Sequence, residues 1–241
     1  MTSAVDPDYA YPMRTIGLLG GMSWESTAHY YRVLNETVRD RAGGLHSAPI
    51  VLHSVDFAPI AELQAADDWD TAAGILGSAA RGLASAGAEF LVIATNTMHI
   101  VAAQIEAAAG IPVLHIADPT AEAIIDAGIG TVGLLGTRFT MEKDFYTGRL
   151  RERGLTAIVP EAADREIVHR IIYDELVLGV VREKSREQYR GVMQRLVDRG
   201  AGGIILGCTE ITLLVGPQDS PVPVFDTTKL HALAAVARAL S

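Results

Sequence analysis

Short apolar runs alternate with longer amphipathic stretches along the 241 residues of the chain. The runs are rich in Val, Ile and Leu, which is typical of parallel strands buried on both faces. Strands that alternate with helices predict an α/β fold in which helices cover parallel sheets. The expected strands are 15–19, 50–53, 90–94, 113–115, 131–135, 157–159, 203–206 and 222–225, and the expected helices include 26–40, 71–86, 164–179 and 184–199.

An internal repeat relates the two halves of the chain. Segment 15–20 (TIGLLG) matches 131–136 (TVGLLG), 116 positions later, and 87–95 matches 200–208, 113 positions later. A Pro-Val pair at 112 recurs at 223, in the same order along the chain. The alternative is convergence of common βα patterns, but three ordered matches at nearly one spacing favour a duplicated unit.

The repeat predicts two similar subdomains, each a parallel sheet flanked by helices, related by pseudo-two-fold symmetry with the active site between them. The N-terminal subdomain is expected to comprise 1–114 plus 222–241, and the C-terminal subdomain 115–221. Ligands in α/β folds bind beyond the carboxyl ends of the strands. Thr95 and Cys208 are equivalent strand ends, so we expect them to face each other across the cleft.

Cys208 stands where a strand ends and a helix is expected to begin. Backbone N–H groups at a helix start lower the pKa of a thiol, so we expect a reactive cysteine. The alternative is a small buried hydrophobic side chain, which is common for free Cys. Thr95 opens the segment Thr-Asn-Thr-Met-His, whose polar side chains suit a helix start and also a carboxylate ligand. His99, on the same helical face as Thr95, is either a structural histidine or a residue that tunes the site.

Composition narrows the classes of partner. The formal net charge is -9, which argues against nucleic acid, because phosphate contacts need a concentrated basic surface. No run reaches the ~18 apolar residues of a membrane helix. The single cysteine excludes an internal disulfide, and residues 1–12 are polar, so we expect a frayed tail without a signal peptide. A cytoplasmic protein is the resulting prediction.

Two kinds of bound group are disfavoured. The glycines in 17–23 do not form a GxGxxG fingerprint, so we expect them to let the backbone approach a neighbouring segment or a small ligand. The seven histidines show no metal-ligand spacing, and we predict no metal. Of the three lysines, Lys143, Lys184 and Lys229, only the last is a plausible Schiff-base candidate, so we predict no cofactor.

The motifs at 16–23 (IGLLGGMS), 95–99 (TNTMH), 171–175 (IIYDE) and 207–210 (GCTE) resemble the aspartate/glutamate racemase superfamily of cofactor-independent racemases. The resemblance covers nearly all of 14–240. It implies two pseudo-symmetric α/β subdomains, a homodimer and an amino-acid substrate. It implies that two opposed residues, here Thr95 and Cys208, exchange protons with the α-carbon. The implied substrate contacts are Met22, Gln64, Asn96, Thr97 and Thr209.

The resemblance also implies how this chain differs within the superfamily. Thr95 replaces one of two cysteines, a variant that looks selective for L-amino acids. Thr95, or a water it holds, would supply the second proton. Because Thr is a far weaker acid than Cys, the reverse reaction would be slow. No arginine follows Val55-Asp56-Phe57 to bind a side-chain carboxylate, so strict aspartate specificity is not expected. The alternatives are a single-cysteine malonate-type decarboxylase or other isomerase on the same scaffold, and a small-molecule binding protein.

Overall fold

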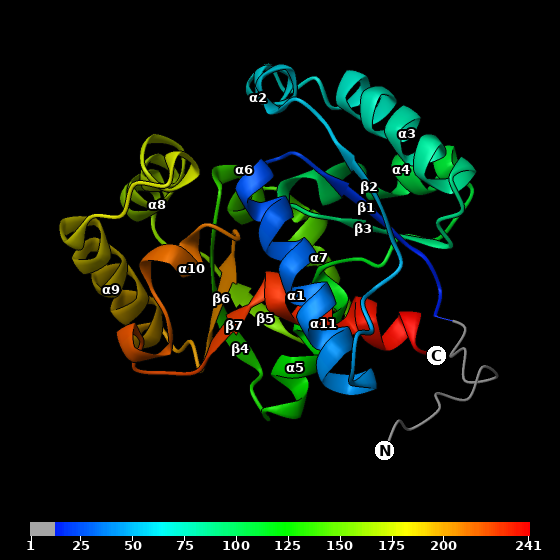
Figure 1. Cartoon of the computed structure of the whole chain (residues 1–241). Coiled ribbons are helices and arrows are strands. Elements are labelled where there is room, and N and C mark those ends of the chain that lie inside the picture. Colours follow the sequence, from blue (N-terminus) through cyan, green and yellow to red (C-terminus); the bar gives the residue numbers. More distant parts are fainter. Residues whose placement is uncertain (1–12) are drawn as a thin grey trace.

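Two parallel sheets form the centre of the molecule (Figure 1). The structure is a computed structural model that describes residues 13–241. The tail expected at 1–12 lies outside the described residues. The first sheet has the strand order β2-β1-β3 and the second β5-β4-β6-β7. The strands are β1 (Ile16–Gly20), β2 (Ile50–Ser54), β3 (Phe90–Ile93), β4 (Thr131–Gly136), β5 (Thr156–Ile158), β6 (Ile204–Gly207) and β7 (Val224–Asp226).

Helices cover both faces of each sheet, because every central strand is apolar and buried. Helices α3 and α4 pack on one face of the first sheet, and α1 and α11 on the other. Helices α8 and α9 cover one face of the second sheet, and α5 and α7 the other. The helices are α1 (Trp24–Ala42), α2 (Phe57–Ala65), α3 (Trp69–Ser85), η1 (Thr97–Val101), α4 (Ala102–Ala109), α5 (Ala117–Asp126), α6 (Arg138–Glu142), α7 (Asp144–Glu152), α8 (Ala162–Asp174), η2 (Leu176–Leu178), α9 (Glu183–Asp198), α10 (Ile211–Leu214), η3 (Pro217–Asp219) and α11 (Thr227–Ala239).

The repeat seen in the sequence recurs in the strand pairing. Gly17 pairs with Leu91 in the first sheet, and their equivalents Gly133 and Ile204 pair in the second. Leu91 also bridges to Val113, as Ile204 pairs with Val224. The two halves therefore share one strand order and one register, and the strands that precede Thr95 and Cys208 occupy equivalent positions in their sheets.

Three local expectations differ from the structure. The strand expected at 113–115 is a single bridge at Val113, because the chain turns at once into α5. The helix expected at 164–179 ends at Asp174 and is followed by a short 3-10 turn that closes on Gly179, whose φ is 70°. Strand β7, expected with the N-terminal subdomain, pairs with β6 of the second sheet.

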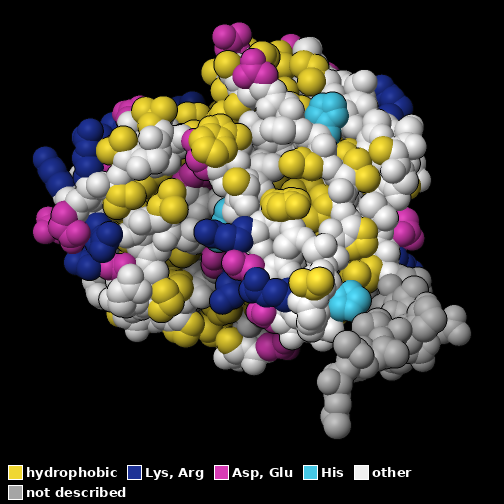
Figure 2. All heavy atoms as spheres, viewed as in Figure 1, with side chains coloured by type: hydrophobic (Ala, Val, Ile, Leu, Met, Phe, Trp, Pro, Cys, Tyr) yellow, Lys and Arg dark blue, Asp and Glu magenta, His cyan; other side chains and the backbone are white. Residues whose placement is uncertain are grey.

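Helix α11 follows β7 directly but packs against α1, under the first sheet. The C-terminal segment thus contributes its strand to one half and its helix to the other. The residue boundaries of the two subdomains therefore stay a proposal. Within residues 13–241, no helix has both the length and the apolar character needed to cross a bilayer. On the face shown in Figure 2, basic and acidic side chains lie next to one another.

Gly21 fixes the turn between β1 and α1, which borders the pocket described below. Its φ is 93°, and a Cβ at this position would collide with the backbone of Val55. Its N–H donates to Thr27 Oγ1 at 2.8 Å. The glycine therefore lets the backbone approach a neighbouring segment, one of the two roles predicted for this stretch.

We expect Gly21→Ala to lower the free energy of unfolding by about 3 kcal/mol, because a side chain there meets both a strained φ and fixed backbone. Gly74→Ala is the matched control, since Gly74 lies in α3 with open space around it. That variant should be neutral or stabilising by about 0.5–1 kcal/mol. Urea unfolding followed by circular dichroism measures both, and equal stabilities of the two variants would contradict the assignment.

Candidate active site

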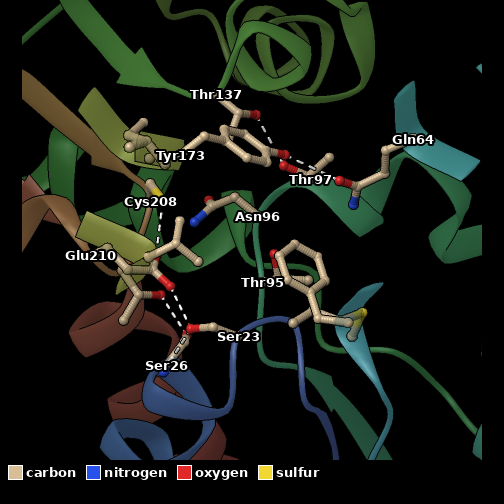
Figure 3. A pocket seen from close by; sticks show the side chains of 16 residues that line it. Ser23, Ser26, Gln64, Thr95, Asn96, Thr97, Thr137, Tyr173, Cys208 and Glu210 are labelled. Atoms are coloured by element: carbon tan, nitrogen blue, oxygen red, sulfur yellow. Dashed lines mark hydrogen bonds between the residues drawn. The ribbon is translucent and has the colours of Figure 1, made fainter. Parts of the chain in front are cut away.

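One pocket lies between the two halves, at the carboxyl ends of both sheets. Its first-half lining comes from the turn after β1, from α2 and from the segment after β3; the second half contributes the segment after β4, α8 and the segment after β6. Figure 3 shows Cys208 and Glu210 on one side and Thr95 and Gln64 on the other. The lining residues are Met22, Ser23, Ser26, Phe57, Gln64, Thr95, Asn96, Thr97, Thr137, Ile172, Tyr173, Val177, Gly207, Cys208, Thr209 and Glu210.

Thr95 and Cys208, the predicted acid and base, both line this pocket and are both partly exposed. Each lies within two residues of the end of a strand, β3 or β6, so the sheets place them without long loops. The backbone at Thr95 is held on two sides: its N–H donates to Ile93 O at 2.8 Å, and its carbonyl oxygen lies 2.8 Å from His99 Nδ1.

Glu210 is bonded to both halves. The Cys208 thiol donates to its Oε2 at 2.9 Å, and the Ser23 hydroxyl donates to its Oε1 at 2.6 Å. Ser23 also caps α1 by accepting from Ser26 N–H at 3.2 Å. The Ser26 hydroxyl in turn donates to Thr209 Oγ1 at 2.8 Å. A buried chain of hydrogen bonds therefore joins the start of α1 to the cysteine segment of the other half.

The surroundings of Cys208 make its thiol a weaker acid than expected. Burial, the negative charge of Glu210 and the hydrogen bond to that carboxylate raise the thiol pKa well above its usual range. The backbone N–H groups of Glu210 and Ile211 lower the pKa, but by less. The predicted lowering of the thiol pKa is therefore wrong: the helix-start effect is present, and burial beside a carboxylate outweighs it.

The five residues implied as substrate contacts all line the pocket, and all five are buried. Gln64 joins the halves across the pocket, because the Tyr173 hydroxyl donates to its Oε1 at 3.2 Å. Asn96 donates through Nδ2 to Thr227 Oγ1 at 3.1 Å, whereas its buried Oδ1 has no hydrogen-bond partner among residues 13–241. Thr97 Oγ1 lies 3.0 Å from Thr137 Oγ1.

Sequence reasoning does not single out several pocket residues. Glu210 enters it only as a neighbour of Cys208, and Tyr173 only as part of a motif. The i, i+2 spacing of Cys208 and Glu210 does not reveal that the carboxylate turns back to the sulfur. Ser23 and Thr137 carry one usable signal, because Ser and Thr shortly after a strand are frequent helix N-caps, whereas Ser26 lies within the first turn of α1.

The pocket lining combines hydroxyl, amide and carboxyl groups with apolar side chains, and it carries no basic side chain among the described residues. A bound carboxylate would therefore rely on hydroxyl, amide and backbone N–H donors. All three lysines lie in the described part of the chain and outside the pocket lining. Residues 13–241 hold no group of three or more His, Cys, Asp or Glu side chains arranged to bind a metal ion.

Comparison with known proteins identifies the family. The sequence model of the Asp/Glu/Hydantoin racemase family matches residues 19–235. A crystal structure of a protein from Yersinia pestis that is assigned as an Asp/Glu racemase is similar to this chain. The two are 58% identical with a TM-score of 0.89, over 95% of this chain and 100% of that one. An aspartate racemase homologue from Pyrococcus horikoshii is 34% identical with a TM-score of 0.82, over 95% and 100%. The broad specificity amino-acid racemase RacX of Bacillus subtilis is 24% identical over 66% of this chain and 68% of its own length.

The chain belongs to the Asp/Glu/Hydantoin racemase family. It is accordingly an isomerase with the two-subdomain α/β fold of that family. The resemblance drawn from the sequence motifs is confirmed.

The thiol assignment can be measured directly, because Cys208 is the only cysteine of the chain. We expect iodoacetamide to alkylate the wild type slowly at pH 8, since the thiolate is the reactive form. Glu210→Gln removes the neighbouring charge and should lower the thiol pKa. The alkylation rate at pH 8 should then rise, by about tenfold if the thiol pKa falls by one. Mass spectrometry across pH 6–10 follows the alkylation rate, which in the wild type should still rise at the upper end of this range.

Glu25→Gln is the control, since Glu25 lies in the first turn of α1 and does not bond to Cys208. It should leave the alkylation midpoint in place. A midpoint near pH 7 in the wild type, or an unchanged midpoint in Glu210→Gln, would contradict the structural account of the thiol.

Proposed function

We propose that this protein is a cofactor-independent amino-acid racemase in which Cys208 and Thr95 act on opposite faces of the α-carbon. One observation carries the proposal: the two residues follow equivalent strands of two repeated sheets and line the same pocket. Racemisation removes a weakly acidic α-proton and returns a proton to the other face. Two acid–base groups on opposite walls are the arrangement that this reaction needs.

The hydrogen bond between Cys208 and Glu210 supports the role of Cys208 as the stronger base. In the resting site the thiol proton faces Glu210 Oε2 across a hydrogen bond of 2.9 Å. Transfer along that bond gives a thiolate and a neutral carboxyl group. The thiolate then takes the α-proton, which restores the thiol and leaves a carbanion. The Ser23 hydroxyl donates to the other carboxyl oxygen and holds Glu210 in place throughout.

Thr95 completes the reaction on the far face. Its hydroxyl, or a water that it holds, gives a proton to the carbanion, and solvent then replaces that proton. Solvent also removes the proton that Glu210 received, so the cycle closes. A threonine alkoxide is too strong a base to stand free at neutral pH, so removal of an α-proton on the Thr95 face is slow. We therefore propose a preference for L-amino acids, as the family resemblance implies for the Thr/Cys variant.

The substrate groups find complementary partners in the lining. The unpartnered Asn96 Oδ1 is an acceptor placed for an α-ammonium group. The hydroxyls of Thr97 and Thr209 and nearby backbone N–H groups are donors for carboxylates. Met22 and Gln64 bound the space for the side chain. Because no arginine or lysine lines the pocket, we propose that it accepts uncharged side chains as well as aspartate and glutamate.

Two further properties belong to the same proposal. Pyridoxal phosphate chemistry would need a lysine in the pocket, and the chain's lysines lie elsewhere, which supports catalysis without a cofactor. A single free thiol at the site fits a reducing compartment, so we propose a cytoplasmic location and a homodimer as the resemblance implies.

α-Proton exchange in deuterated water tests the role of Cys208. We expect the wild type to exchange the α-proton of one enantiomer much faster than that of the other, in a screen of L- and D-amino acids. Cys208→Ala should abolish this exchange, because its thiolate is the base on that face. Proton NMR measures both. Persistent exchange in Cys208→Ala would contradict the assignment of Cys208 as the base.

Replacing Thr95 by cysteine tests the asymmetry. A second thiol on the far face would accept protons more readily, so Thr95→Cys should bring the α-proton exchange rates of the two enantiomers closer together. Thr95→Val, which keeps the shape and removes the hydroxyl, is the matched control and should suppress conversion. Proton NMR follows the exchange of each enantiomer, and circular dichroism follows its conversion. Unchanged asymmetry in Thr95→Cys would count against Thr95.

A decarboxylase of malonate-type acids is the second candidate, and the presence of one thiol and not two favours it. A proton from Cys208 to a planar intermediate would suffice for that reaction. Release of carbon dioxide from a disubstituted malonate, without α-proton exchange on amino acids, would replace the racemase proposal.

A further inference from the structure

His99 is fully bonded and buried behind Thr95. Its Nδ1 lies 2.8 Å from Thr95 O, and its Nε2 accepts from Ile116 N–H at 3.2 Å. The side chain is 3% exposed. A backbone N–H can only donate, so Nε2 carries no proton, and Nδ1–H must donate to the Thr95 carbonyl. The two bonds thus select one neutral tautomer.

This contact ties Thr95 to the crossover between the halves. Ile116 immediately precedes α5, where the chain enters the second half. The Thr95 carbonyl would otherwise lie at the point where the chain leaves the sheet and enters η1, with no strand neighbour. The imidazole therefore sets the direction of the Thr95 peptide group, and with it the direction of the Thr95 side chain.

Two more histidines surround His99. The His115 ring centroid lies 4.6 Å away and that of His231 5.8 Å away. His231 is itself fixed between Leu114 O, at 2.8 Å from Nε2, and the Tyr30 hydroxyl, at 2.9 Å from Nδ1. Burial and its histidine neighbours lower the pKa of His99 well below its usual range. The neutral form that both hydrogen bonds require is thus also the form that the surroundings favour.

We propose that His99 is a positioning residue: it orients Thr95 for the proton transfer on the Thr95 face. The inference rests on the proposed racemase function. His99 does not line the pocket, and its proposed role concerns one half-reaction only. Cys208 has no contact with His99 among the described hydrogen bonds, so the half-reaction on the Cys208 face does not depend on it.

The half-reactions on the Cys208 and Thr95 faces can be measured separately, so a loss on the Thr95 face can be distinguished from a loss of folded protein. Exchange of the α-proton that faces Cys208 needs Cys208 and Glu210 but not Thr95, whereas conversion to the other enantiomer also needs Thr95. Loss of the His99 contact should therefore lower conversion relative to exchange. A displacement of about 1 Å at a reacting group costs up to 100-fold in rate, so we expect the ratio to fall about 10- to 100-fold.

The test uses a pair of polar variants. In His99→Asn the side-chain amide reaches the Nδ1 position and keeps the donor to Thr95 O. In His99→Gln the amide reaches the Nε2 position and keeps only the acceptor for Ile116 N–H. We expect His99→Asn to retain most of the wild-type ratio of conversion to exchange, and His99→Gln to lose it. Proton NMR and chiral chromatography of the same reaction supply the two rates.

His115→Asn is the matched control, because His115 lies in the same buried cluster and makes no bond to Thr95. It should leave the ratio unchanged even where it lowers stability. A ratio that stays at the wild-type value in His99→Gln, or that falls equally in all three variants, would overturn the positioning role alone. A wild type without exchange would overturn the proposed function, and the inference with it.

Discussion

The hydrogen bond from Ser23 to Glu210 joins the two halves at the point where both sheets end. Ser23 is fixed because its oxygen also caps α1, and Glu210 is fixed because it receives the Cys208 thiol on its other oxygen. A buried polar group left without a partner costs about 1–3 kcal/mol, so a shift of one half against the other would break several such bonds together. The spacing of the pocket walls depends on this contact.

Glu210, which Ser23 holds in place, also influences the acid–base behaviour of Cys208. The Cys208 thiol donates to Glu210 Oε2 across 2.9 Å, and burial and the charge of that carboxylate raise the thiol pKa. In the proposed reaction the same carboxylate accepts the thiol proton when the sulfur acts as the base, and solvent removes that proton later in the cycle.

Much of this arrangement is readable from the sequence. The repeat predicts that Thr95 and Cys208 occupy equivalent strand ends, and the observed registers at Gly17–Leu91 and Gly133–Ile204 agree with it. The direction of the thiol pKa is not readable, because it depends on the rotation of one side chain. The pairing of β7 with β6 agrees with the repeat of the Pro-Val pair, but the sequence does not reveal that the helix after β7 packs against the first sheet.

The duplicated frame also shows where the asymmetry of the site resides. Thr97 and Glu210 are equivalent positions, each two residues after the reacting side chain, and each bonds to a helix N-cap of the opposite half. Thr97 bonds to Thr137, the cap of α6, at 3.0 Å, and Glu210 bonds to Ser23, the cap of α1, at 2.6 Å.

One geometry therefore carries a neutral hydroxyl pair on the threonine side and a carboxylate on the cysteine side. A carboxylate can receive the thiol proton, whereas a hydroxyl pair offers no anionic acceptor. A thiol placed at position 95 would meet Thr97 and not a carboxylate, so the two faces differ at two positions of the repeat, 95 against 208 and 97 against 210.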